Sequence, residues 1–147
     1  MSDKELITQG EGAKVEFKRE LSSKDKTFLK TVVAFSNGEG GTIVFGVDDI
    51  THDIIGIDND ALFSLMDIVA NKISDSITPQ VIPLITFETE KNKTLMIVDI
   101  QKGCYTPYYL KSEGLNQGVF IRIGATTRLA EDYTIKELTL SGMTKSY

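Results

Sequence analysis

The sequence is poor in the residues that form disulfides or bind zinc. Its 147 residues include one cysteine, Cys104, and one histidine, His52. A single cysteine cannot form an internal disulfide, and these two residues cannot supply the four ligands of a structural zinc site. A metal centre in this chain would therefore need carboxylate ligands, which suit Mg²⁺ or Mn²⁺.

Long apolar runs are also absent. No stretch approaches the roughly 20 residues that a membrane helix requires. The first residues, MSDKELITQGEGAK, lack the basic and then apolar pattern of a signal peptide. There is no tryptophan, but 41% of the residues are hydrophobic and 25% are charged, which is typical of a globular domain. We therefore expect one folded, cytoplasmic domain with no membrane partner.

Positive charge is scarce overall, since the net charge is −5. This counts against nucleic-acid binding, because Lys and Arg contacts to phosphates dominate the affinity. The distribution is uneven, however. Lys and Arg outnumber Asp and Glu by seven to six in residues 1–30 and by six to four in residues 101–147, but are outnumbered three to eleven in residues 31–100. If the fold brings the two ends together, they can form a locally positive face.

Hydrophobic periodicity predicts an alternation of strands and helices in the first half of the chain. The expected elements are a half-buried strand at 14–21, a helix at about 23–36, a central strand at 42–47 that forms a hairpin with 54–57, and a second helix that ends before Pro79. Ser22 with Asp25 gives a capping-box signal for the first helix, and Asn59 is the expected cap of the second.

The second half of the chain is predicted to be richer in strands. We expect strands at about 81–89 and 94–100 around a tight turn at 90–93, a short extended piece at 107–111, a strand at 119–123, and a terminal helix opened by Thr134 and Glu137. In the strand at 119–123 the odd-numbered residues should face inward, with Phe120 and Arg122 on the other face. The predicted fold class is α/β of the α+β kind, with a mixed sheet of about six to seven strands and two main helices.

Four ordered motifs carry a resemblance to a known family. They are Glu11 with Glu16-Phe17-Lys18, the run 34–49 (AFSNGEGGTIVFGVDD), Pro107-Tyr108-Tyr109, and the run 120–124 (FIRIG) followed by Arg128 and Ala130. Together they resemble the Schlafen AlbA-like domain over roughly residues 8–132. We divide the chain into an N-terminal segment (1–12), this domain (13–133), and a short C-terminal helix and tail (134–147).

The resemblance implies two kinds of activity. Bacterial relatives are commonly described as candidate transcriptional regulators or as related to RecG-type helicases, often with a winged-helix or ATPase-like segment after this domain. No such segment follows in this sequence, so the chain either works alone or is the N-terminal piece of a longer protein. Schlafen nucleases cleave structured RNA with a divalent metal at a three-carboxylate site.

The catalytic and metal-binding candidates that match this nuclease site are Glu11, Glu16 and one of Asp48 or Asp49. Clustered carboxylates hold Mg²⁺ or Mn²⁺, which polarise a phosphodiester and activate water. The alternative is that Glu16, Lys18 and Glu20 are the solvated face of an amphipathic strand.

A glycine-rich turn is the candidate phosphate-contacting loop. Gly38, Gly40 and Gly41 could bring backbone N–H groups close to a phosphate, although the turn lacks the Gly-Lys-Ser/Thr ending of an ATP-binding loop. The alternative is a helix C-cap followed by a tight turn.

Basic residues near the two ends of the chain are the candidate nucleic-acid contacts: Lys18, Arg19, Lys111, Arg122 and Arg128. Arginine is suited to gripping phosphates without reading bases, although exposed Lys and Arg also simply keep a surface soluble. The sequence thus favours a nucleic-acid-binding domain, for DNA or RNA, of a transcriptional regulator. A metal-dependent endoribonuclease and a non-catalytic dimerisation domain are the alternatives, the latter through strand edges or the Tyr108-Tyr109 segment.

Overall fold

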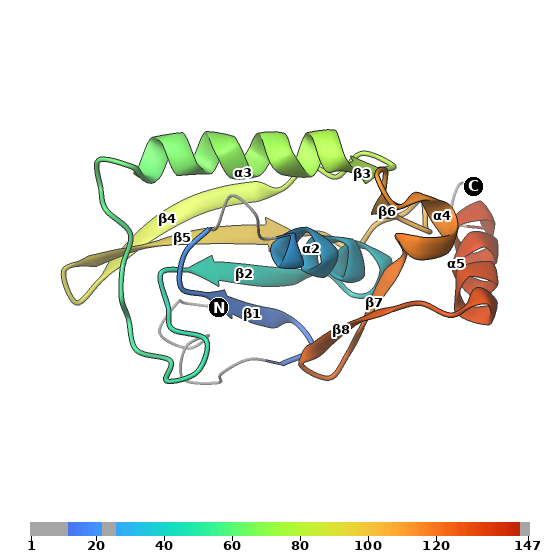
Figure 1. The fold of residues 1–147 in the computed structure, drawn as a ribbon, viewed down its shortest axis with the longest axis horizontal. Helices are drawn as coiled ribbons and strands as arrows, with labels where there is room; N and C mark the ends of the chain where they lie inside the picture. Colours follow the sequence, from blue (N-terminus) through green and yellow to red (C-terminus); the bar gives the residue numbers. More distant parts are fainter. Residues whose placement is uncertain (1–11, 22–25, 145–147) are drawn as a thin grey trace.

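The computed structural model describes residues 12–21 and 26–144, and its centre is a four-stranded sheet (Figure 1). The strand order is β1-β2-β5-β4. β1 runs parallel to β2, whereas β2 and β4 both run antiparallel to β5. The strands are β1 (Val15–Lys18), β2 (Gly41–Phe45), β4 (Leu84–Glu90) and β5 (Lys93–Ile100).

Smaller elements surround this sheet. The described residues form four helices, α2 (Thr27–Asn37), α3 (Leu62–Ser76), α4 (Gly114–Gln117) and α5 (Asp132–Thr144). β3 (Ile77–Thr78) pairs with β6 (Tyr109–Leu110), and β7 (Phe120–Ile123) pairs with β8 (Thr126–Leu129) as a hairpin. The predicted mixed α/β class is confirmed, but the described strands form this four-stranded sheet and two separate pairs instead of one mixed sheet of about six to seven strands. None of the helices in these residues is long and apolar enough to cross a membrane.

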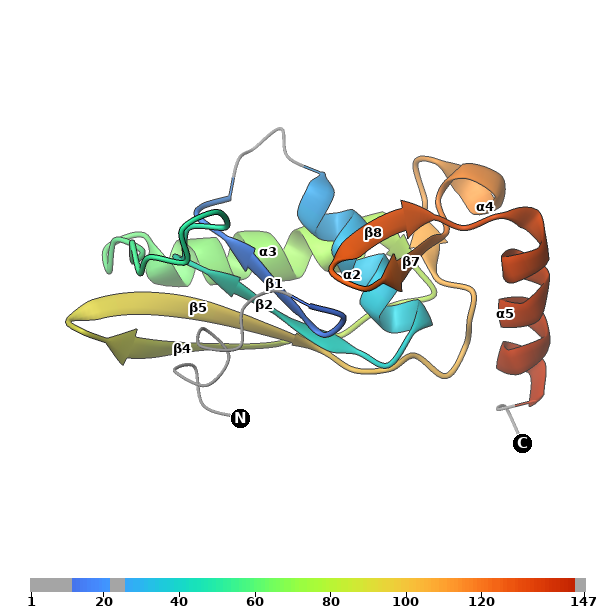
Figure 2. The same ribbon diagram turned by 90° about the horizontal axis from the view of Figure 1, so that it is seen from below.

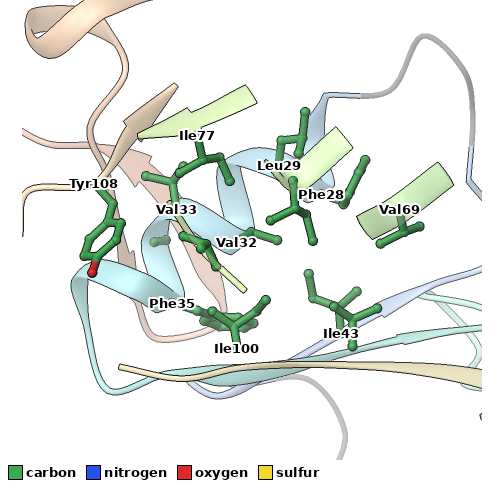
Figure 3. Packing of buried hydrophobic residues seen from close by; sticks show 14 of the residues in the cluster. Phe28, Leu29, Val32, Val33, Phe35, Ile43, Val69, Ile77, Ile100 and Tyr108 are labelled. Carbon is green, nitrogen blue, oxygen red and sulfur yellow. The ribbon is translucent and has the colours of Figure 1, made fainter. Parts of the chain in front are cut away.

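The main core lies between one face of the sheet and the helices α2 and α3 (Figure 3). α2 is buried on almost every side, from Val32 through Ser36, because β7 covers the flank that the sheet does not. This double burial explains its apolar composition, since a helix packed on one side only would keep a polar stripe. A second cluster on the opposite face of the sheet comprises Val15, Phe17, Val44, Val47 and Leu95.

The side chain of Asn37, the last residue of α2, holds the C-terminal part of the fold against this helix. Its amide nitrogen donates to the carbonyl oxygens of Tyr108 and Phe120, each at 3.0 Å, and its amide oxygen accepts from the Tyr108 N–H at 2.7 Å. Tyr108 is buried and belongs to the main core. One polar side chain thus fixes the β6 and β7 segments, about 70 and 80 residues away in sequence, against the end of α2.

Several local predictions were wrong. The hairpin of 42–47 with 54–57 is reduced to an isolated bridge between Val47 and Ile54, because β2 pairs instead with β1 and β5. Asn59 does not cap α3, which begins at Leu62; its side chain accepts a hydrogen bond from Thr94 at 2.6 Å. The Ser22–Asp25 capping box lies outside the described residues.

The turn between β4 and β5 is confirmed, with Lys91 and Asn92 both at positive φ, as a two-residue hairpin turn requires. At the other end of the chain, α5 begins at Asp132, so Thr134 and Glu137 lie inside the helix rather than at its start.

Candidate functional site

Arg122 is the most heavily bonded of the predicted site residues. Its guanidinium Nη1 lies 2.7 Å from Oε2 of Glu16, and both side chains are largely buried, with 5% and 15% of their surfaces exposed. Nε and Nη2 donate to the carbonyl oxygen of Gly12, Nη2 also donates to that of Val15, and Nη1 donates to Oγ1 of Thr127. The guanidinium thus joins β7 to the segment around β1.

Both faces of β7 are covered by helices. Arg122 stacks over the ring of Phe35 in α2, with its central carbon 5.3 Å from the ring centre. Val119 and Ile121 pack instead with Ile135 and Leu138 of α5. Phe120 and Arg122 therefore face the main body of the protein, and the prediction that Ile123 faces inward with Val119 and Ile121 was wrong, since Ile123 is 50% exposed. The donors of Arg122 are directed at groups of the chain itself.

Glu16 is positioned by the same strand alternation that was predicted. Val15 and Phe17 are buried on one face of β1, and Glu16 and Lys18 are half-buried on the face toward α2. Glu16 is therefore not on a solvated face. Its Oε2 is buried beside Arg122 and accepts no hydrogen bond from the described residues, so the contact is a charge pair without good hydrogen-bond geometry.

Asp48 follows β2 and organises its own loop. Its Oδ1 accepts the backbone N–H groups of Ile50 at 2.8 Å and of Thr51 at 2.9 Å, and its Oδ2 lies 3.4 Å from Nη1 of Arg19. The backbone N–H of Thr51, then that of Ile50, favour the charged carboxylate and hold the pKa of Asp48 below its ordinary value of 3.8. Asp49 is exposed beside it.

The described carboxylates do not fit the divalent metal that the nuclease resemblance implies. Glu16 is paired with Arg122, and Asp48 is occupied by backbone donors and Arg19. Across residues 12–21 and 26–144, no group of three metal-ligating side chains is close enough to hold an ion. The third predicted ligand, Glu11, lies outside the described residues. Among the residues described, a guanidinium occupies the position beside Glu16.

The glycine-rich turn closes the end of α2 against β5. The N–H groups of Gly38 and Gly40 both donate to the carbonyl oxygen of Phe35, at 3.2 and 2.9 Å. Gly40 has φ of +82°, and a Cβ there would lie 2.7 Å from the carbonyl oxygen of Ile100; a Cβ on Gly41 would lie 2.7 Å from the Phe35 ring. Close packing accounts for Gly40 and Gly41, and two of the N–H groups point at the helix end. Phosphate contact by this turn stays a prediction.

The remaining basic candidates lie in separate parts of the structure. Lys18 and Arg19 stand at the end of β1, and Arg19 lies beside Asp48 in an acidic loop. Arg128 is exposed on β8, and Lys111 is exposed just after β6. The structure therefore does not bring all five predicted basic residues onto one surface.

Two lysines at the start of α2, which were not among the predicted contacts, lie near Lys111 and the β7–β8 hairpin. Lys26 and Lys111 line the same pocket, of about 270 Å³, together with Asp75. Lys30 lies one turn after Lys26, with its ammonium 5.4 Å from the ring centre of Phe120 in β7. Their i, i+4 spacing on a predicted helix was the signal that could have identified them.

The hairpin of β7 and β8 lies against this part of α2, as Figure 2 shows. Oγ1 of Thr31 is 3.2 Å from Oγ1 of Thr127, so Thr127 faces α2, whereas Arg128, the next residue of β8, lies on the opposite face of the hairpin with its strand partner Ile121. We call the exposed residues Lys26, Lys30 and Lys111 the α2 basic surface. α2 contains no acidic residue, and its N-terminus adds partial positive charge to this side of the molecule.

Comparison with known proteins gives one relative by sequence and two solved structures with a similar fold. Over 98 residues, the chain is 34% identical to an uncharacterized ATP-binding protein of Ureaplasma parvum, which covers 63% of this chain and 28% of that protein. The fold matches the solved N-terminal domain of a helicase RecG-related protein from Nitrosomonas europaea, with a TM-score of 0.60 and 28% identity over 87% of this chain and 90% of that one. The chain therefore spans little more than a quarter of the Ureaplasma protein but nearly all of the Nitrosomonas domain.

A solved protein from Corynebacterium diphtheriae, DIP2311, shares the fold at 18% identity and a TM-score of 0.62, over 81% of this chain and 25% of that one. The family model described as Schlafen, AlbA_2 matches residues 11–131, which include β1, α2, the glycine turn and the β7–β8 hairpin. The predicted resemblance is thereby confirmed, and the chain belongs to the Schlafen AlbA_2 family.

Proposed function

We propose that this domain binds nucleic acid through the α2 basic surface. The observation that carries the proposal is the gathering of three exposed lysines from two separate parts of the chain, in a protein with a net charge of −5. Lys26 and Lys30 come from α2 and its N-cap, and Lys111 directly follows β6. Cations of this kind neutralise phosphates independently of base sequence.

The distribution of negative charge supports the same surface. Residues 48–67 contain six aspartates and no Lys or Arg, and they form the loop after β2 and the first part of α3. A polyanion would be repelled from this segment and attracted to the α2 basic surface, so the two regions together would orient it. The similarity to a domain of a RecG-related protein agrees with a nucleic-acid ligand.

One point of the sequence-based hypothesis changes within this proposal. Arg122 acts by positioning the β7–β8 hairpin, because its donors are directed at the chain itself. A preference for duplex DNA over structured RNA would favour the predicted role in the regulation of transcription.

Fluorescence anisotropy with a labelled DNA duplex and a labelled RNA hairpin tests the proposal. The double variant Lys26→Gln/Lys30→Gln should weaken binding, and the slope of log affinity against log salt should become shallower by about 0.9 for each phosphate that is no longer neutralised. The matched control is Lys91→Gln/Lys136→Gln, which removes the same charge from the β4–β5 turn and from α5.

Two results would contradict the proposal. One is the lack of measurable binding by the wild-type protein at low salt. The other is an equal loss of affinity in both double variants, which would show a response to net charge rather than to this surface.

A further inference from the structure

The sheet has one protected edge and one open edge. β1 forms the first edge, and Arg122 ties the segment of β7 to its carbonyl groups. β4 forms the other edge, is seven residues long, and pairs with β5 along its whole length on one side (Figure 2). No described strand pairs with its second side. A long strand with a free row of backbone donors and acceptors is a template for another strand.

Apolar side chains accompany this free edge. Leu84 and Phe87 of β4 are 58% and 46% exposed, Ile82 just before the strand is 78% exposed, and Phe63 of α3 is 66% exposed. Phe63 and Phe87 meet edge to face, with their ring centres 5.9 Å apart. Leu84 and Phe87 lie on opposite faces of the strand, so exposed apolar groups flank this edge on both sides. Such groups are a feature of protein interaction sites, because they are removed from water on association.

We propose that β4 pairs antiparallel with β4 of a second copy of this chain, which makes a continuous eight-stranded sheet around a two-fold axis at Phe87. Phe87 is the middle residue of β4, so a two-fold axis there leaves no end of either strand unpaired. The two copies of Phe87 and Phe63 would then form one aromatic cluster at the axis. This proposal is independent of nucleic-acid binding.

The charges of β4 are compatible with this register and disfavour the register with its axis at Glu88. With the axis at Phe87, each Glu88 lies opposite Thr86 of the partner, and each Glu90 lies opposite Leu84, so no two carboxylates oppose each other. An axis at Glu88 would place the two Glu88 side chains directly opposite each other, which is destabilising. A second copy is therefore a chemically suitable occupant of the edge.

The sign of a charge at Thr86 tests the register. Thr86→Lys should strengthen the dimer and Thr86→Glu should weaken it, because each places a charge opposite Glu88 of the partner; with two such pairs per dimer, the dissociation constant should change on the order of tenfold in each direction. Analytical ultracentrifugation or light scattering over a concentration series measures this constant. If both changes weaken the dimer, the axis is not at Phe87.

The position of the interface is tested separately. Phe87→Glu should dissociate the dimer, whereas Leu140→Glu, at a similarly exposed leucine on α5, should not. Circular dichroism of each variant confirms folding, and the Thr86 pair gives an answer if Phe87→Glu fails to fold. A monomeric wild-type protein at millimolar concentration, or a dimer indifferent to all β4 changes, would overturn the proposal.

Discussion

The two edge strands of the central sheet, β1 and β4, differ in whether another part of the chain covers their outer backbone groups. At β1, backbone carbonyl groups of Gly12 and Val15 receive hydrogen bonds from Arg122, and the β7–β8 hairpin lies alongside. At β4, the second side of the strand has no partner among the described strands, and large apolar side chains are exposed. One edge is closed by a buried arginine from a distant hairpin, and the other is available to a second molecule.

The comparison also separates two arginines that look alike in sequence. Arg122 and Arg128 lie on paired strands of one hairpin, six residues apart. Arg122 is buried between Glu16, Phe35 and Thr127, whereas Arg128 is exposed and its Nε donates a 3.4 Å hydrogen bond to Thr126 in its own strand. The first belongs to the closed edge, and the second is exposed on the face of the hairpin that points away from α2.

The largest expected effect is at the closed edge. Arg122→Ala should lower the free energy of unfolding by about 3–5 kcal/mol, because it leaves the carboxylate of Glu16 buried without its positive partner. Urea denaturation followed by circular dichroism measures the change.

Arg128→Ala is the matched control and should change the free energy of unfolding by no more than about 0.5 kcal/mol, as expected for a surface substitution. Similar losses of stability in the two variants would show that the Arg122–Glu16 pair does not hold the closed edge.

At the open edge the same kind of truncation should cost less. Phe87→Ala should lower the free energy of unfolding by about 1–2 kcal/mol at low protein concentration, since its side chain is only half-buried and a fully buried Phe→Ala change costs about 3–5 kcal/mol. Chemical denaturation at two protein concentrations measures it. A loss as large as that of Arg122→Ala in dilute protein would mean that β4 is not an open edge in the monomer.

The smallest expected effect concerns the loop after β2. The pKa of Asp48 is lower in the folded protein than its ordinary value of 3.8, so its charged form stabilises the fold above that pH. This contribution is lost as the pH falls through the folded-state pKa. Asp48→Asn should therefore lower the thermal midpoint at pH 7, and the difference between the two proteins should shrink as the pH falls below about 4.

Asp49→Asn is the control for this loop, because Asp49 is exposed and its carboxylate is adjacent in sequence. Thermal melts from pH 3 to 7 followed by circular dichroism make the comparison. A constant difference between wild type and Asp48→Asn across this range would show that the backbone hydrogen bonds of Asp48 do not depend on its charge.

The sequence predicted the elements whose residues repeat with a clear period. The alternation of Val15 and Phe17 with Glu16 and Lys18 placed β1, and the apolar spacing in α2 placed that helix to within a few residues of its end at Asn37. The hairpin of 42–47 with 54–57 failed because pairing partners are chosen by the whole sheet. β5, about fifty residues later, supplies a longer apolar partner for β2 than the nearby segment does.

For the candidate site, the sequence identified some of the residues but not where they lie relative to one another. Lys111 belongs to the α2 basic surface and Arg128 is exposed on the other face of the hairpin, but Lys26 and Lys30 were missed and Arg122 is buried. A strand pattern tells which residues share a face, but not which face another element will cover. For β7 both faces are covered, by α2 on one side and α5 on the other, so alternation alone could not place Arg122.

By itself, therefore, the sequence determined the fold class and the Schlafen AlbA_2 family, because periodicity and ordered motifs are properties of the chain read in order. Only the tertiary structure decided which charges meet. Burial and distance determine whether a guanidinium holds a strand in place or is exposed to solvent, and both depend on segments that lie up to 110 residues apart in this protein.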